Sequence, residues 1–145
     1  GGELRAWYRG HSSTLSALDF SPDGLVLATV GHDRKLRLWN PETAIQRYAV
    51  VAHQDWVRSV DFSPDGLSLV TAGDDGIVRL WHRVTGQLLL ELPDEGQPVW
   101  KAAFSAGGDR IACRTRDGRI VVYDTREPSA ETIDGRRHRS DAVPD

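Results

Sequence analysis

Histidine, threonine and aspartate recur together at one spacing in this sequence. They are His11, Thr29 and Asp33 and, 42 residues later, His53, Thr71 and Asp75. A histidine, an acid and a hydroxyl are the groups of an acyl-transfer triad. The repetition argues against catalysis, because an active site is normally built once, and no Gly-x-Ser-x-Gly elbow is present to expose a nucleophile. We therefore expect no catalytic residue here and predict that the chain is not an enzyme.

Metal and cofactor sites also lack their sequence signatures. The five histidines and the single cysteine, Cys113, lie in separate segments without a Cys-x-x-Cys or His-Glu-x-x-His motif. There is no Gly-x-x-x-x-Gly-Lys-Ser/Thr loop for a nucleotide phosphate. We predict no metal and no cofactor. A lone cysteine cannot form an internal disulfide and fits a reducing compartment, so we expect a cytoplasmic protein.

Composition narrows the class of partner. The 145 residues are 39% hydrophobic and 27% charged, with a net charge of −3, which is typical of a globular domain. The slightly acidic balance gives no general reason to expect nucleic acid or a membrane as partner. The only argument for nucleic acid is the group of three arginines Arg136, Arg137 and Arg139. In an acidic chain this is a weak signal, so nucleic acid is an unlikely partner. No apolar run approaches the ~18 residues of a membrane span, and residues 1–10 do not resemble a signal peptide.

The positions that could carry chemistry belong to a repeat. The segment DFSPDGL at 19–25 returns at 61–67, and AAFSAGG follows at 102–108. Phe20, Phe62 and Phe104 keep the period of 42 residues. Short runs rich in β-branched and aliphatic residues alternate with Pro-Asp-Gly turns, and no segment has a helical apolar period. The sequence predicts an all-β fold.

Four short antiparallel strands cannot bury both faces of their sheet alone, so a repeat of about 40 residues favours radially stacked blades of a β-propeller. The Gly10-His11 pair, the Ser-Pro-Asp-Gly turns and the Leu-Trp endings at 38–39 and 80–81 resemble WD40 repeats. Repeats are expected at 10–51 and 52–93, with a degenerate third at 94–136. Tyr123-Asp124 replaces the Trp-Asp pair in the third repeat, and Glu95-Gly96 stands where Gly-His is expected.

The two ends of the sequence are interpreted as parts of further repeats. Residues 1–9 are expected to supply the outer strand, over 3–8, of a preceding incomplete blade. Residues 137–145 are expected to begin a truncated repeat opened by His138; a polar tail is the alternative. With about three complete blades, the chain is expected to form an open arc, or part of a larger or oligomeric propeller.

The WD40 resemblance implies a hydrogen-bonded network in each blade. In the first repeat, Asp33, His11, Thr29 and Trp39 would be linked in that order. The second repeat has Asp75, His53, Thr71 and Trp81 at the same positions. A linked network satisfies each polar group that it buries. Glu95, Cys113 and Tyr123 replace three of the four residues in the third repeat, so we expect no such network there and the least stable blade.

Partners of this family usually dock on the face formed by the turns before the first inner strand and before the second-turn aspartate. By position, that face carries the candidate partner-binding residues His32, Trp56, Arg58, Asp74, Trp100 and Arg116. Tryptophan and arginine anchor many interfaces, so a protein or peptide partner is predicted, and the affinity of guanidinium for carboxylate favours an acidic one. The tryptophans could instead only pack between blades.

Three functions stay open on the sequence. The leading one is a non-enzymatic protein–protein interaction scaffold. One alternative is the sensor or scaffold portion of a larger enzyme, for example a bacterial signalling ATPase or protein kinase. The other is a fragment that assembles with copies of itself through its open blade faces.

Overall fold

All regular secondary structure in the described part of the chain is β-strand, which confirms the all-β prediction. The structure, a computed structural model, describes residues 1–126 and 137–139. Two sheets of four antiparallel strands come first, here called blade 1 and blade 2. Blade 1 contains β1 (Leu15–Phe20), β2 (Leu27–Gly31), β3 (Lys35–Asn40) and β4 (Ile45–Val51). Blade 2 contains β5 (Val57–Phe62), β6 (Ser68–Gly73), β7 (Val78–His82) and β8 (Leu88–Glu91).

Blade 3 has the same strand order but a different outer strand from the one expected. It contains β9 (Val99–Phe104), β10 (Arg110–Thr115), β11 (Ile120–Asp124) and β12 (Arg137–Arg139). The backbone of β12 pairs with β11, with Arg137 opposite Tyr123. Residues 137–139 therefore occupy the outer edge of blade 3, where the prediction placed the start of a further repeat, because the backbone of β11 needs a partner on that side. The rest of that prediction, and residues 127–136, lie outside the described residues.

The Ser-Pro-Asp-Gly motif forms a hydrogen-bonded turn directly after the innermost strand of blade 1 and of blade 2. In blade 1, Ser21 Oγ donates to Asp23 Oδ1 at 2.6 Å, and the Leu25 N–H donates to the same oxygen at 2.9 Å. Gly24 has a φ of 74°, in the left-handed region that glycine tolerates best. The turn at 63–68 repeats these bonds in blade 2. The motif thus sets the same reversal at the same point of both blades.

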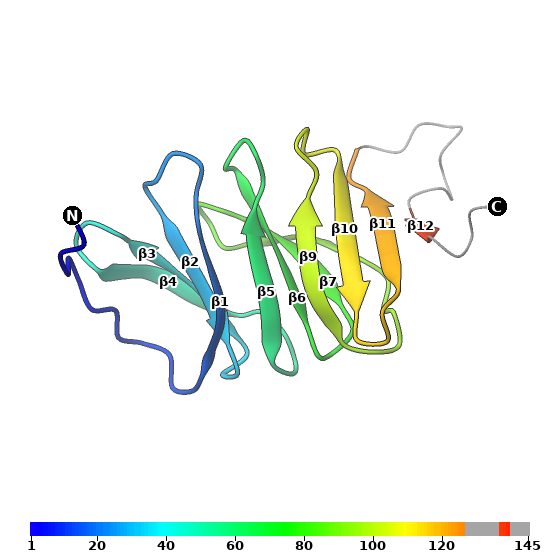
Figure 1. The fold of residues 1–145 in the computed structure, drawn as a ribbon, viewed down its shortest axis with the longest axis horizontal. Coiled ribbons are helices and arrows are strands. Elements are labelled where there is room, and N and C mark those ends of the chain that lie inside the picture. The colour runs from blue at the N-terminus through cyan, green and yellow to red at the C-terminus, as the bar shows by residue number, and fades with distance from the viewer. Residues whose placement is uncertain (127–136, 140–145) are drawn as a thin grey trace.

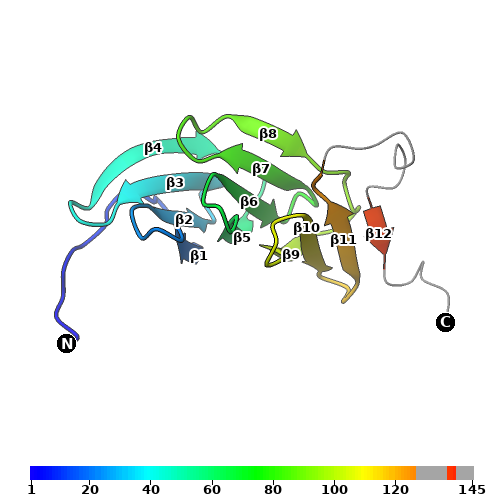
Figure 2. The same cartoon turned by 90° about the horizontal axis from the view of Figure 1, so that it is seen from above.

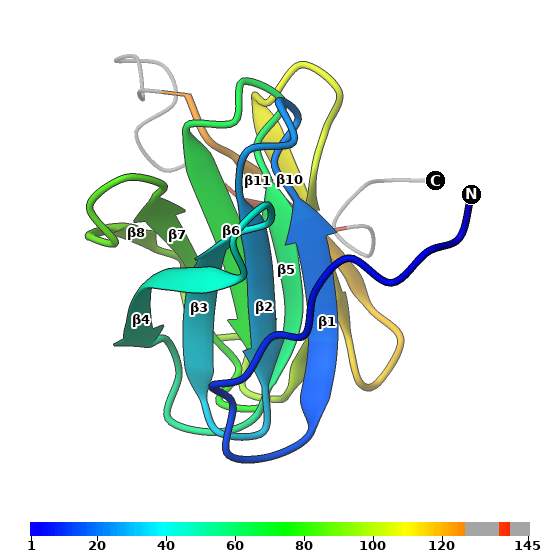
Figure 3. The same ribbon diagram turned by 90° about the vertical axis from the view of Figure 1, so that its left-hand side faces the viewer.

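The blades stack face to face into an arc (Figures 1 and 2). Figure 2 shows β1, β5 and β9 along the concave side and β4 and β8 on the convex side, and Figure 3 looks onto blade 1. One apolar core, including Val30, Leu38 and Phe62, fills the junction of blades 1 and 2. A second core, including Leu80 and Ile111, fills the junction of blades 2 and 3. The hydrophobic core therefore lies between the sheets, as expected for stacked blades.

Half-buried aspartates also connect the innermost strands. Asp19 Oδ2 accepts a hydrogen bond from the Phe62 N–H at 2.9 Å, and Asp61 Oδ2 accepts one from the Phe104 N–H at 2.9 Å. Burial raises the pKa of Asp61, and the neighbouring carboxyl of Asp19 raises it further. Ala103 holds the equivalent position in blade 3, so that blade has no carboxylate to offer a following strand.

Residues 1–14 contain no strand, so the outer strand expected over 3–8 is not formed. A strand needs a neighbour for its backbone groups, and the sequence contains no inner strands of a preceding blade. The assignment of 1–9 to such a blade therefore stays a prediction. The open side of blade 1 exposes Leu15, Leu18 and Phe20, whose exposed fractions are 47%, 60% and 53%.

Candidate partner-binding surface

A series of hydrogen bonds joins four side chains of blade 1, from the turn after β2 to the third strand. His11 Nδ1 lies 2.8 Å from Asp33 Oδ2, and His11 Nε2 lies 2.6 Å from Thr29 Oγ1. Trp39 Nε1 donates to Thr29 Oγ1 at 2.9 Å. The histidine, threonine and tryptophan hydrogen-bonding groups of this series are all paired when His11 donates from Nδ1 and accepts the Thr29 proton at Nε2. Burial lowers the pKa of His11 although Asp33 opposes that effect, which favours this neutral ring.

Blade 2 contains the same series of hydrogen bonds, and its arginine lies closer to the aspartate than the 3.7 Å between Arg37 Nη2 and Asp33 Oδ2 in blade 1. His53 lies 2.9 Å from Asp75 and 2.8 Å from Thr71, and Trp81 Nε1 donates to Thr71 at 2.9 Å. Arg79 Nη1 donates to Asp75 Oδ2 at 3.0 Å. Burial alone would raise the pKa of Asp75, but the hydrogen bonds from His53 and Arg79 hold it well below its usual range. The structure thus brings together all eight residues of the two predicted networks.

Blade 3 satisfies its polar groups differently. The buried Tyr123 hydroxyl donates to the buried carboxyl of Glu95. Cys113 takes the hub position of threonine, and burial, with a contribution from Glu95, raises the pKa of its thiol to about 12. Asp117 lies apart from this pair, where the Thr115 hydroxyl and the Gln97 amide donate to it. The four-residue network is absent from blade 3, and a tyrosine–glutamate bond replaces it; the lower stability of this blade stays a prediction.

The threonine hydroxyls of both networks are buried, although a pocket of about 480 Å³ borders His11, Thr29 and Trp39 of blade 1. Thr29 is 4% exposed and Thr71 is 0% exposed. Each hydroxyl is held between a histidine and a tryptophan. Each hydroxyl thus uses its proton for the histidine and a lone pair for the tryptophan within its own network. Their geometry fits a structural role in holding the loops at one end of the blades.

The candidate binding residues meet at that same end. All innermost strands start there, and the turns after β2 and β6 return to it. The His32 and Trp56 rings stack with centroids 3.7 Å apart and an interplanar angle of 4°, which joins blade 1 to blade 2. The Arg58 guanidinium lies 5.1 Å from the Trp56 ring centroid and 5.9 Å from that of Trp100. These side chains form a continuous aromatic and cationic array across three blades.

Asp74 fixes the orientation of the central arginine. Arg58 Nε and Nη2 each donate to one oxygen of Asp74 at 2.8 Å. This hydrogen-bonded pair raises the pKa of Arg58. Asp74 therefore occupies the bidentate position at Arg58 that a carboxylate of a partner would otherwise take. His32, Trp56, Arg58, Asp74 and Trp100 are called the tryptophan surface below.

Arg116 lies at the same end but outside the array. Its backbone N–H donates to the Pro98 carbonyl at 2.9 Å, and its side chain is exposed. Trp56 and Trp100 stay 42% and 38% exposed within the array. The sequence indicated the tryptophans and arginines because these residue types are common in interfaces. The hydrogen bonds between Arg58 and Asp74 were missed, because they depend on the spacing between strands.

Other kinds of site find little support in the described residues. Residues 1–126 contain no group of three or more histidine, cysteine and acidic side chains that could hold a metal ion. No helix long and apolar enough to cross a membrane occurs in the part of the chain that the structure describes.

Radially stacked sheets of four antiparallel strands, with a repeated network in two of them, define blades of a β-propeller. Residues 2–40, 45–82 and 86–124 match the WD40 family (WD domain, G-beta repeat), so the chain belongs to the WD40 repeat family. The resemblance inferred from the repeat is confirmed. The first matched stretch begins at residue 2 and so includes the segment that precedes β1.

Two named relatives share parts of this sequence. Over 120 residues, or 80% of the chain, it is 33% identical to telomerase protein component 1 of Rattus norvegicus, of which this stretch is 4%. Over 44 residues, or 30% of the chain, it is 41% identical to transducin beta-like protein 2 of Homo sapiens, of which the stretch is 10%. The chain therefore spans a small fraction of the length of the curated relatives that it matches.

Proposed function

We propose that the chain is a non-enzymatic, cytoplasmic protein-interaction platform whose partner docks on the tryptophan surface. The observation that carries this proposal is the array of Trp56, Arg58 and Trp100, stacked across blades 2 and 3 and still accessible to solvent. Membership in a repeat family of scaffolds supports it, since stacked blades hold many loops on a fixed frame.

The geometry favours a protein or peptide that inserts an apolar or aromatic side chain. Asp74 balances the charge of Arg58, so the array offers flat, partly desolvated aromatic faces more than a free cation. Tryptophan is among the residue types that contribute most to interfaces. Arg116 supplies an exposed positive charge at the edge of the same end, where an acidic residue of the partner would gain a modest rim contact.

Self-assembly is the weaker alternative, because the two open sides of the arc do not match. In blade 2, Ser59 and Ala72 face blade 3 and are buried. Blade 3 has Lys101 and Arg114 at these positions, paired across β9 and β10. A second copy docked head to tail would press the apolar residues of blade 1 onto two cations, and burying charges without partners is costly.

Selection from a random peptide library displayed on phage tests the proposed surface. Peptides enriched on the wild-type chain are measured against Trp56→Ala, Trp100→Ala and the control Trp7→Ala. Trp7 is 78% exposed and lies outside the surface. We expect the first two variants to lose at least tenfold in affinity and the control to keep wild-type affinity. Peptides that bind all four proteins equally, or a selection that enriches none, would contradict the proposal.

A further inference from the structure

The junction between blades 1 and 2 contains an arginine that acts as a ligand within the chain. Arg83, in the turn after β7, reaches across to the turn after β1. Its Nη1 donates to Asp23 Oδ2 at 2.9 Å and its Nη2 to Asp23 Oδ1 at 3.2 Å. Nη1 also donates to the Gly66 carbonyl at 3.3 Å. The junction thus has a guanidinium position defined by one carboxylate and one backbone carbonyl.

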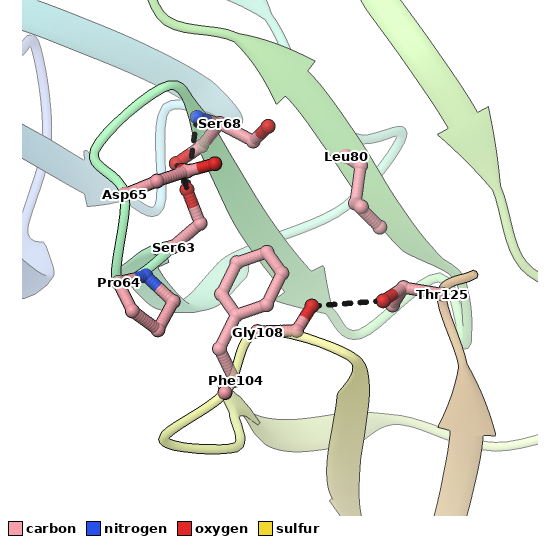
Figure 4. A pocket seen from close by; sticks show the side chains of 9 residues that line it. Ser63, Pro64, Asp65, Ser68, Leu80, Phe104, Gly108 and Thr125 are labelled. Carbon is pink, nitrogen blue, oxygen red and sulfur yellow. Dashed lines mark hydrogen bonds between the residues drawn. The ribbon is translucent and has the colours of Figure 1, made fainter.

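The next junction has the same position without the arginine. One period later, Asp65 and Gly108 replace Asp23 and Gly66, and Thr125 replaces Arg83. Thr125 Oγ1 donates to the Gly108 carbonyl at 2.9 Å, but its short side chain makes no bond to Asp65. A pocket of about 260 Å³ remains between them, shown in Figure 4. Its lining is Ser63, Pro64, Asp65, Ser68, Leu80, Phe104, Gly107, Gly108 and Thr125.

Asp65 is held in the orientation that Asp23 uses to bind Arg83. Its Oδ1 accepts hydrogen bonds from Ser63 Oγ at 2.6 Å and from the Leu67 N–H at 2.9 Å, as Figure 4 shows in part. These bonds hold the pKa of Asp65 below its usual range, so the carboxylate is ionised at neutral pH. Its Oδ2 accepts no hydrogen bond from the described residues. The equivalent oxygen of Asp23 is the one that accepts from Arg83 Nη1.

We propose that this pocket binds the guanidinium group of an arginine side chain supplied by a partner protein. Asp65 would accept two guanidinium N–H groups, and the Gly108 carbonyl would accept a third, as Asp23 and Gly66 do for Arg83. A planar guanidinium meets these acceptors as a fork, whereas a lysine ammonium is a point charge. Pro64, Leu80 and Phe104 supply apolar surface for the methylene stem, which long cationic side chains bury while the head is hydrogen-bonded.

This site is separate from the tryptophan surface. The turns after the innermost strands and the turns after the third strands lie at the opposite end of the blades from the tryptophan surface. An arginine bound in this pocket would therefore be a second contact with a partner, apart from the tryptophan surface. This proposal does not depend on the proposed function. An arginine in the pocket would also bridge blades 2 and 3, as Arg83 bridges blades 1 and 2.

Titration of N-acetyl-L-arginine methylamide into the ¹⁵N-labelled chain tests the pocket. We expect saturable shifts of the amides of Leu67, Gly108 and Thr125, at least tenfold weaker binding to Asp65→Asn, and at least fivefold weaker binding of the lysine analogue. Glu42→Gln is the matched control, since it removes the same charge from an exposed turn at the same end and should bind as wild type does. Absence of these shifts, or equal affinity for both analogues, would overturn the proposal.

Thr125→Arg keeps the test decisive if Asp65→Asn fails to fold. The new arginine is expected to occupy the pocket, raise the melting temperature and abolish binding of the probe; binding at wild-type affinity would overturn the proposal. Free L-arginine distinguishes the two sources of a guanidinium. Equal affinity for free arginine and the methylamide indicates a site for an arginine side chain in a polypeptide. Tighter binding of free arginine would overturn assignment to a protein partner and assign the pocket to the amino acid.

Discussion

The Tyr8 hydroxyl donates a 2.9 Å hydrogen bond to the carbonyl of Pro41. The Tyr48 hydroxyl donates to the Arg83 carbonyl at 2.6 Å, and Arg83 lies one period after Pro41. In both cases a tyrosine from the segment before an innermost strand contacts the turn after a third strand. The segment before β1 thus repeats one contact of an outer strand although it forms no strand itself.

Tyr8→Phe tests whether that contact stabilises blade 1. Loss of the hydroxyl removes one hydrogen bond and keeps the ring that packs edge-on against Trp39 at 5.5 Å. We expect the free energy of unfolding to fall by about 1 kcal/mol, measured by urea denaturation. The control is Trp7→Phe, which changes the neighbouring, more exposed aromatic residue and should leave stability unchanged. Equal stability of Tyr8→Phe and wild type would show that the contact contributes nothing.

Thr71→Val tests the hub of the blade 2 network. Valine keeps the shape of the fully buried side chain but leaves Trp81 Nε1 and His53 Nε2 without their partner. An unsatisfied buried polar group costs about 1–3 kcal/mol, so urea denaturation should show a loss of about 2 kcal/mol or more. Thr85→Val, in an exposed turn, is the matched control and should change stability little. A loss no larger than that of the control would contradict the role assigned to the network.

The blade 1 network makes stability depend on pH below neutrality. Burial lowers the pKa of His11 from 6.5, although Asp33 opposes the shift and Arg37 adds to it. Below pH 6.5 the unfolded chain therefore binds a proton at His11 more readily than the folded chain does. The contribution of neutral His11 to the free energy of unfolding is fully present above pH 6.5 and is lost as the pH falls below that value. Urea titrations at pH 7.5, 6.5 and 5.5 should show a steeper loss for wild type than for His11→Gln. Parallel curves would contradict this prediction.

The two cations on blade 3 are predicted to prevent head-to-tail association. Lys101→Ser together with Arg114→Ala copies Ser59 and Ala72 of blade 2 onto the open face of blade 3. We expect this variant to self-associate, because the apolar open side of blade 1 then meets an uncharged surface. Light scattering after size exclusion should give the monomer mass of 16.1 kDa for wild type and a larger mass for the variant.

Adding Leu18→Asp to that variant should restore the monomer, since Leu18 belongs to the apolar face. Discrete wild-type oligomers, or a double variant that stays monomeric, would contradict the assigned role of the cations.

The repeat explains which features could be predicted from the sequence. Strands and turns recur with fixed spacing, and the networks use four residue types at repeated positions, so His53, Thr71 and Trp81 could be assigned together. Features that arise where repeats differ were missed. The bond between Arg58 and Asp74 depends on the distance from β5 to the turn after β6, which residue types do not reveal.

The pocket beside Thr125 was missed for a related reason. A threonine in a turn carries no signal by itself, and it becomes informative only when Arg83 is seen to fill the equivalent junction. The pairing of β12 with β11 likewise depends on backbone groups at the edge of β11 and not on the residue types of 137–139, which is why that segment was assigned to a further repeat.

The central claim is that a partner binds the tryptophan surface, and the indole N–H signals of the five tryptophans test it most directly. A peptide selected on the wild-type chain is added to the ¹⁵N-labelled protein. Trp56 and Trp100 should shift with saturation. Trp39 and Trp81, whose indoles donate to buried threonines, should not shift, and neither should the exposed Trp7, which lies outside the surface. Saturable binding that leaves Trp56 and Trp100 unchanged would place the partner elsewhere and contradict the account.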